Sequence, residues 1–71
     1  MGKMTVPKGE QIRVSYLNGD RVLCFLVTEK LNVGFSLYEV SADGLKRIGK
    51  ARSPVELERK YDVLRKVGIK T

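Results

Sequence analysis

The side chains best suited to chemistry with a partner form a basic cluster in the second half of the chain. Four cations fall within seven residues without an acidic neighbour: Lys46, Arg47, Lys50 and Arg52. Such side chains bind phosphate oxygens by charge and reach alone, and each phosphate that they neutralise steepens the salt dependence of binding. Arg13, on an earlier strand, is a further candidate, because a sheet face can enter the major groove and read bases. These five residues are the predicted nucleic-acid-binding set.

The same cluster has a simpler interpretation, which the sequence leaves open. Sheets often carry lysine and arginine on an edge strand, where the charges prevent edge-to-edge aggregation. The chain of 71 residues has a formal net charge of +6. Such an excess favours polyanionic partners, but it also serves solubility. The charge therefore predicts either a nucleic-acid-binding surface or a solubilising edge.

Few residues suit catalysis or metal binding. The chain has no histidine, so the commonest general base and metal ligand is absent, and its serines have no histidine to activate them. It also lacks a glycine-rich phosphate-binding loop with the spacing of nucleotide-binding proteins. The single cysteine, Cys24, lies in an apolar run and is expected to be a small buried hydrophobe in a reducing, cytoplasmic setting. We therefore expect a protein that is not an enzyme and uses no metal or cofactor.

The elements that must position the basic cluster begin with a β-hairpin. A first strand is expected over residues 10–17, because apolar and polar residues alternate there with a period of two. Asn18-Gly19 follows and favours a two-residue type I′ turn, since both residues accept a positive φ. This register would set Ile12 opposite Phe25 on one apolar face.

A second hairpin carries the basic cluster itself. Its strands are expected over residues 35–41 and 45–51, joined by a three-residue Ala42-Asp43-Gly44 loop with the glycine in a left-handed conformation. In that register Glu39 opposes Arg47, so an acid faces a base. This pairing favours the three-residue loop over a two-residue turn at Asp43-Gly44.

Two features of the strands call for an explanation from the tertiary structure. The second strand, residues 21–29, is apolar on both faces, which indicates a central strand that is covered on both sides. A helix can cover one side, and sheet curvature, the termini or a partner must cover the other. Gly49, inside the fourth strand, indicates a bulge or a close approach of another group.

One amphipathic helix is expected after the strands. Ser53 is its predicted cap, Pro54 occupies the first helical position, and Glu56 completes a capping box. Gly68 is the expected stop at its C-terminal end. Residues three and four positions apart form an apolar stripe on one face of this helix: Leu57, Tyr61 and Leu64.

The chain is expected to form one small domain. Residues 1–9 are predicted to be a flexible N-terminal arm, residues 10–68 a single α+β domain, and residues 69–71 a tail. The predicted fold is ββββα, with a four-stranded antiparallel sheet (three-stranded as the alternative) and one C-terminal helix packed on a face. The longest apolar run, residues 22–27, is far shorter than the roughly 20 residues that cross a bilayer, so no membrane partner is expected.

The segment from about residue 21 to residue 67 resembles the small N-terminal DNA-binding domain of integrases from Gram-positive conjugative transposons. The resemblance lies in the order of the strands, in the helix that follows them and in four short segments: Tyr38-Glu39-Val40, Asp43-Gly44, Lys46-Arg47 and Ser53-Pro54. In that family a three-stranded sheet, backed by one helix, lies in the major groove. Residues 35–61 are also similar to short uncharacterised proteins encoded on such mobile elements. The chain departs from the family by adding the Asn18-Gly19 hairpin.

Two functions from different classes follow as hypotheses. The first is a non-catalytic accessory protein of a mobile element that binds duplex DNA through the basic hairpin. The alternative is a protein-interaction or structural module that uses the apolar sheet face, with a protein partner or a second copy of the chain covering it. The first depends on the uninterrupted basic cluster, and the second on the strand that is apolar on both faces.

Overall fold

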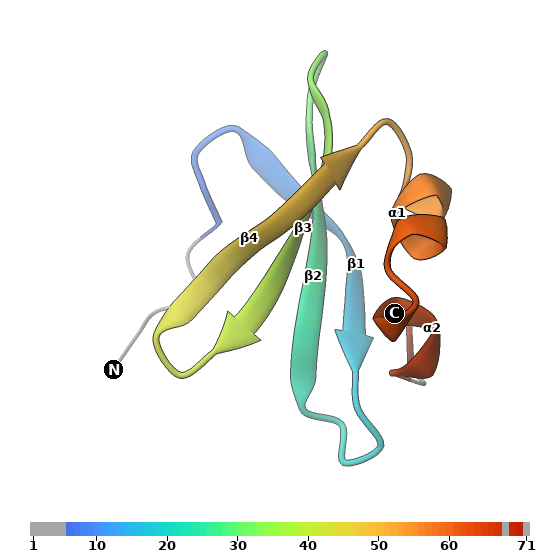
Figure 1. Cartoon of the computed structure of the whole chain (residues 1–71). Coiled ribbons are helices and arrows are strands. Elements are labelled where there is room, and N and C mark those ends of the chain that lie inside the picture. The colour runs from blue at the N-terminus through green and yellow to red at the C-terminus, as the bar shows by residue number, and fades with distance from the viewer. Residues whose placement is uncertain (1–5, 68, 71) are drawn as a thin grey trace.

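The structure, a computed structural model, describes residues 6–67, 69 and 70 and has an α+β fold (Figure 1). Its elements in chain order are β1 (Glu10–Leu17), β2 (Leu23–Lys30), β3 (Gly34–Ser41), β4 (Gly44–Ala51), α1 (Pro54–Lys60), α2 (Val63–Lys66) and β5 (Ile69–Lys70). The strands form one antiparallel sheet in the order β4-β3-β2-β1-β5. The predicted ββββα fold is confirmed, and residues expected in the tail form β5 beside β1.

The β1–β2 connection is longer than the predicted two-residue turn. The Asn18 Oδ1 atom accepts hydrogen bonds from the backbone N–H groups of Asp20 and Val22, at 2.8 and 3.0 Å, and this closes a wider loop over residues 18–22. Tyr16 consequently pairs with Phe25, and both side chains are buried. The predicted pairing of Ile12 with Phe25 is wrong, because burying the two aromatic rings together decides the register.

The β3–β4 turn is one residue shorter than predicted. Ser41 pairs with Gly44, which has a φ of 121°, so only Ala42 and Asp43 lie between the strands. Glu39 therefore faces Lys46 instead of Arg47. Glu39 still pairs with a basic residue, but the predicted three-residue loop is wrong.

Gly49 marks both a bulge and a close approach, as predicted. Leu37 pairs with Gly49 while its neighbour Tyr38 pairs with Arg47, so Ile48 is an extra residue in β4. The Tyr61 hydroxyl lies against Gly49, where a Cβ atom would collide with it. A side chain at this position would have to displace the Tyr61 ring.

The predicted single helix is divided into α1 and α2. The cap forms as expected, because the Ser53 Oγ atom accepts a hydrogen bond from the Glu56 N–H group at 3.2 Å. The Glu56 carboxylate accepts from the N–H group of Arg52, where the predicted capping box has that of Ser53. Tyr61 then adopts extended backbone angles (φ −123°, ψ 94°) and ends α1. This break allows Tyr61 to reach Gly49 while Leu64, in α2, stays buried. Gly68, the predicted stop, lies outside the described residues.

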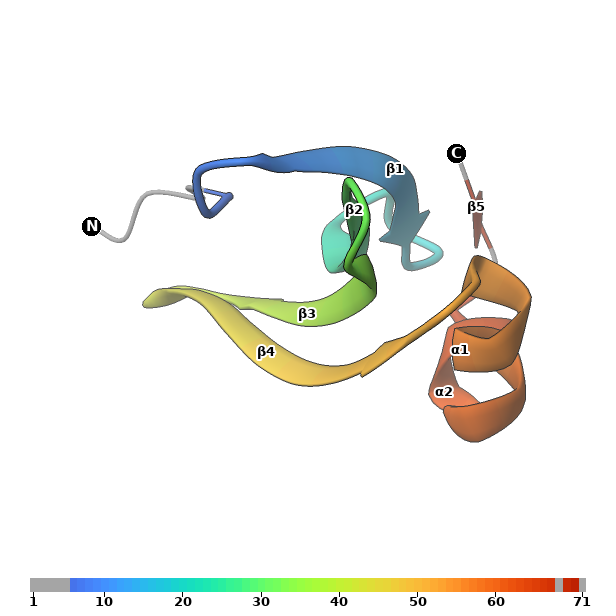
Figure 2. The same ribbon diagram turned by 90° about the horizontal axis from the view of Figure 1, so that it is seen from above.

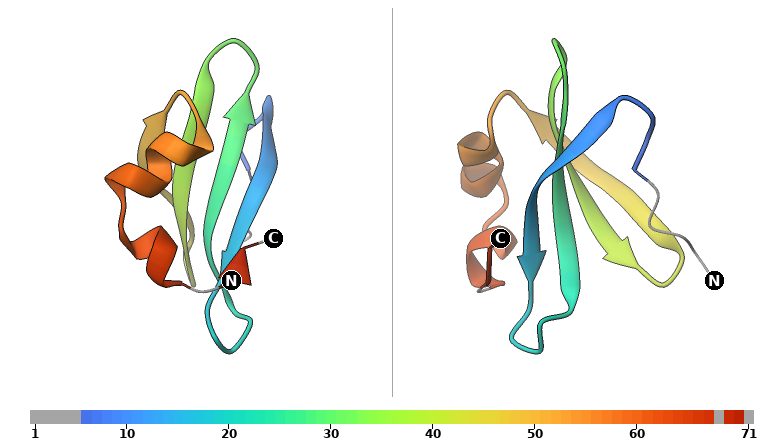
Figure 3. Two further views of the ribbon diagram at one scale, coloured as in Figure 1. Left: turned by 90° about the vertical axis from the view of Figure 1, so that its right-hand side faces the viewer. Right: turned by 180° about the vertical axis from the view of Figure 1, so that it is seen from behind.

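The sheet has an apolar layer on each face. The helices lie together on one side of the sheet (Figure 3) and cover a core of six buried side chains: Tyr16, Phe25, Val27, Leu37, Leu57 and Leu64. The sheet curves strongly, so that β1 lies on one side of β2 and β3 and β4 lie on the other (Figure 2). The face away from the helices is called the curved face. Leu26 and Tyr38 are buried there, at 2% and 5% exposure. The strand that is apolar on both faces is central, as predicted, and curvature of the sheet covers its second face.

Cys24 of the same strand is less deeply placed than expected. Its side chain is half-buried, packs against the core cluster and lies 3.4 Å from the backbone oxygen of Val22. Cys24 packs against the apolar core as predicted, but its side chain is not fully buried.

Candidate nucleic-acid interface

The bulge in β4 brings two of the predicted cations onto one face of the sheet. In a regular strand, residues three positions apart point to opposite faces. Because Ile48 is an extra residue, Arg47 pairs with Tyr38 and Lys50 pairs with Ser36, which are two residues apart in β3. Cross-strand partners share a face. Arg47 and Lys50 therefore both project from the curved face, away from the helices.

Arg52 completes this group at the end of β4. The side chains of Arg47, Lys50 and Arg52 line a cleft of about 190 Å³ between the start of β3, the end of β4 and the start of α1. Gly34 shapes its floor: its φ is 132°, and a Cβ atom there would lie 2.9 Å from the backbone oxygen of Ala51. A larger residue would force the two strands apart and change the cleft.

The cations of the cleft differ in how they are held. The Nη2 atom of Arg47 donates a hydrogen bond to the Oγ atom of Ser36 at 3.0 Å, and Ser36 is buried. Among the described residues, neither Lys50 nor Arg52 has a carboxylate within ion-pair distance. The cleft thus combines one guanidinium of fixed direction with two exposed cations that are free to move towards an anion.

One carboxylate limits where an anion can bind. Glu56 lines the cleft on its helical side, and its Oε2 atom accepts a hydrogen bond from the backbone N–H group of Arg52 at 3.0 Å. The negative charge repels anions from the start of α1. An anion in this cleft would meet the least repulsion on the side away from Glu56.

The structure does not bring the other two predicted site residues into this cleft. Lys46 pairs with Glu39, on the face that carries the helices. Arg13 lies on β1, which β2 and β3 separate from β4, and its Nε atom forms an ion pair with Glu29 at 2.8 Å. Of the five predicted residues, three line one cleft and two lie apart from it.

A polar network beside Arg47 could not be recognised in the sequence. The Oε1 atom of Glu10 accepts hydrogen bonds from the hydroxyl groups of Thr28 and Tyr38, each at 2.7 Å. These contacts join β1 to β3 across β2 on the curved face. No local pattern marks them, because the three residues come from separate strands and meet only once the register is set.

Ionisation in this network follows from its contacts. Burial alone would raise the pKa of Glu10, but the hydrogen bonds from Thr28 and Tyr38, and the charges of Arg47 and Lys30, lower it below the usual 4.5. Burial, together with the hydrogen bond to Glu10 and its charge, raises the pKa of Tyr38. Glu10 is therefore an anion and Tyr38 a neutral donor at neutral pH. The network supports the curved face next to the cleft, and nothing in it activates a nucleophile.

The chain was compared with protein-family models, curated proteins and solved structures, and none of them matches it. The resemblance to integrase DNA-binding domains thus stays a prediction from the residues. Within residues 6–67, 69 and 70, no group of three or more histidine, cysteine, aspartate or glutamate residues could hold a metal ion. In the same part of the chain no helix is long and apolar enough to cross a membrane.

Proposed function

We propose that this protein is a non-catalytic DNA-binding protein, and that Arg47, Lys50 and Arg52 bind the phosphate backbone of a duplex. The observation that carries the proposal is the alignment of these three exposed cations along one cleft. A bulge and a glycine are both needed to build it. A charged edge that served only to prevent aggregation would not require its cations on the same face.

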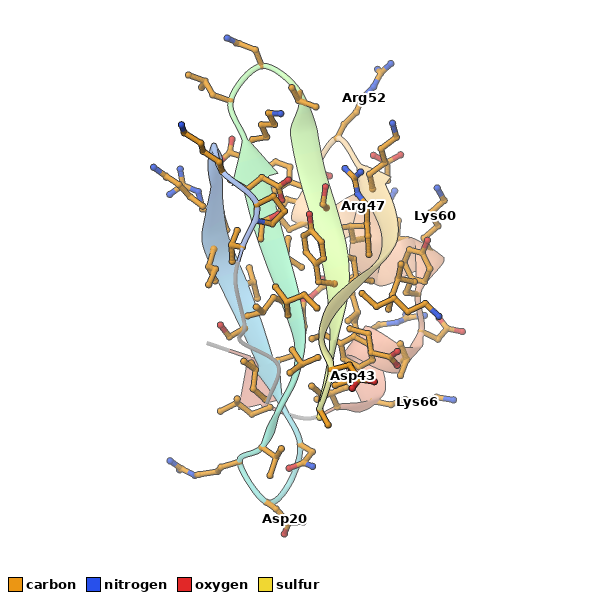
Figure 4. The ribbon with its side chains drawn as sticks, turned by 90° about the vertical axis from the view of Figure 1, so that its left-hand side faces the viewer. Asp20, Asp43, Arg47, Arg52, Lys60 and Lys66 are labelled. Atoms are coloured by element: carbon orange, nitrogen blue, oxygen red, sulfur yellow. The ribbon has the colours of Figure 1, made fainter. Side chains whose placement is uncertain are left out.

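The distribution of charge supports an extended polyanion as the partner. Arg47 and Arg52 lie towards one end of the molecule, and Asp20 and Asp43 lie at the opposite end (Figure 4). A duplex would attract the end that carries Arg47 and Arg52. The basic hairpin resembles the arm-type domains of integrases, and the proposal extends to an accessory role on a mobile element.

The cleft suits the edge of a phosphate backbone better than an isolated anion. Glu56 also lines it, and the three cations are exposed rather than enclosed. Contacts to at most three phosphates predict a slope of about −2.7 for the logarithm of the binding constant against the logarithm of the salt concentration. Binding of this kind is weak at physiological salt unless other contacts add to it.

The alternative, a protein-interaction module, was suggested by the strand that is apolar on both faces, and the structure removes that reason. The second apolar face of β2 is covered within the chain, since Leu26 and Thr28 are buried there. No partner is needed to shield this strand. That alternative stays a prediction with no particular surface assigned to it.

The test compares two double charge reversals that change the net charge equally. Arg47→Glu with Lys50→Glu removes the proposed site, whereas Lys60→Glu with Lys66→Glu reverses two exposed cations on the helical side (Figure 4). Affinity for a mixed-sequence duplex is measured by fluorescence anisotropy at several salt concentrations, with circular dichroism to check folding. We expect the first variant to lose about tenfold or more in affinity and the second to lose much less.

Two results would contradict the proposal. Equal losses in both variants would show that only the total charge matters and that the cleft is not the site. A wild-type protein that does not bind the duplex even at low salt would remove DNA binding altogether.

A further inference from the structure

The tip of the β2–β3 hairpin presents two apolar side chains to solvent. Leu31 is 79% exposed and Val33 is 67% exposed, the highest values among the large hydrophobic residues that the structure describes. The turn between them is well defined, because Asn32 has a φ of 65° and the Val33 N–H group donates to the Lys30 oxygen at 3.0 Å. The tip extends beyond the other strands at one end of the sheet (Figure 1). Most of the surface of these two side chains faces solvent rather than the rest of the chain.

The apolar tip borders the cationic cleft. Val33 and Gly34 line the same cleft as Arg47, Lys50 and Arg52. Lys30, at the base of the turn, is exposed as well. A ligand in contact with this end of the molecule would therefore meet positive charge and apolar surface side by side.

We propose that Leu31 and Val33 form a wedge that enters the minor groove and inserts between base pairs, while the neighbouring cleft holds a phosphate group of the same duplex. The inference rests on the proposed function and adds to it a deformation of the DNA. Apolar side chains that enter a base step from the minor groove unstack it and kink the duplex towards the major groove. The hairpin is already ordered by β-sheet hydrogen bonds, so insertion does not require folding of the tip.

The juxtaposition of charge and apolar surface favours DNA as the occupant. In a duplex the phosphate backbone and the stacked bases lie next to each other, as the cleft and the tip do in this protein. Phosphate contacts depend on salt, whereas the apolar wedge does not. An anionic lipid surface would also attract cations beside an apolar tip, so the test includes a membrane arm.

The test uses the double variant Leu31→Ser with Val33→Ser and the control Val22→Ser. Val22 is 56% exposed in the loop at the other end of the sheet, so its replacement removes exposed apolar surface without touching the tip. Binding to a duplex is followed by anisotropy, unstacking by the fluorescence of 2-aminopurine in the duplex, and bending by energy transfer between labelled DNA ends. Vesicles containing phosphatidylserine provide the membrane arm.

We expect wild type and Val22→Ser to raise 2-aminopurine fluorescence and to shorten the distance between the DNA ends. The double variant should lose both signals and bind about tenfold more weakly, with the salt dependence unchanged. If wild type binds DNA without unstacking or bending it, the wedge is refuted while the proposed function stands. If wild type does not bind DNA, both the wedge and the proposed function are refuted. The same conclusion holds if wild type binds vesicles instead and the double variant loses that binding.

Discussion

Replacing Gly49 with alanine tests how β4 and the helical segment fit together. The backbone of Gly49 lies outside the positive-φ region, so alanine meets no conformational penalty there. Its Cβ atom would instead collide with the Tyr61 hydroxyl and lie 2.9 Å from the Cζ atom of that ring. Such overpacking costs about 1–3 kcal/mol. The reduced entropy of the unfolded chain offsets about 0.4–1 kcal/mol of it. We expect a net destabilisation of about 1–2 kcal/mol.

Urea unfolding, followed by circular dichroism, measures this difference against a matched control. Gly19→Ala introduces the same methyl group where no heavy atom lies within 4 Å, and it should be neutral or slightly stabilising. Combining Gly49→Ala with Tyr61→Ala removes the collision. In the Tyr61→Ala background, Gly49→Ala should therefore become neutral or stabilising, which gives a coupling energy of at least about 1 kcal/mol.

The double-mutant cycle has two outcomes that would refute this reasoning. If Gly49→Ala destabilises the protein equally with and without Tyr61, the two residues do not interact and another cause must act on β4. If Gly49→Ala and Gly19→Ala have the same effect, the contact between Tyr61 and the bulge contributes nothing to stability. Packing of Tyr61 against Gly49 would then not account for the division of the helix at Tyr61.

Two further predictions concern pH. The pKa of Glu10 lies below its usual 4.5 in the folded protein, so the stability from its hydrogen bonds is complete above that pH and is lost as the pH falls. Glu10→Gln should flatten the acid limb of a stability profile measured by urea unfolding, and an unchanged limb would contradict the network. Burial, with the charge and hydrogen bond of Glu58, raises the pKa of Tyr16 from 10.0 to about 12. The contribution of the neutral Tyr16 hydroxyl to the free energy of unfolding should therefore be lost as the pH rises from 10 to 12. Titration of phenolate absorbance checks this, and Tyr16→Phe should remove the group that titrates near pH 12; if that group persists in the variant, the assignment is contradicted.

The sequence by itself determined the features that depend on neighbouring residues. The pattern of apolar and polar residues predicted β1 to β4 to within two residues of their observed bounds, whereas the residues of β5 were expected to form a tail. The start of α1 was predicted by Ser53, Pro54 and Glu56, because capping involves atoms within a single turn. The basic cluster could also be identified, since its members are close in the chain. Each of these features follows from local backbone preferences and from the period of the side chains.

Only the tertiary structure decided which of these residues act together. The side-chain cap at Asn18 and the burial of Tyr16 against Phe25 set the first register, and the bulge at Ile48 set the face of Lys50. In the first register Phe25 pairs with Tyr16 instead of Ile12, a shift of four residues. The bulge adds a single residue to β4, and a shift of one residue exchanges the two faces of a strand. The cleft and the Glu10 network join residues that are far apart in the chain, so packing of the whole sheet is what selects them.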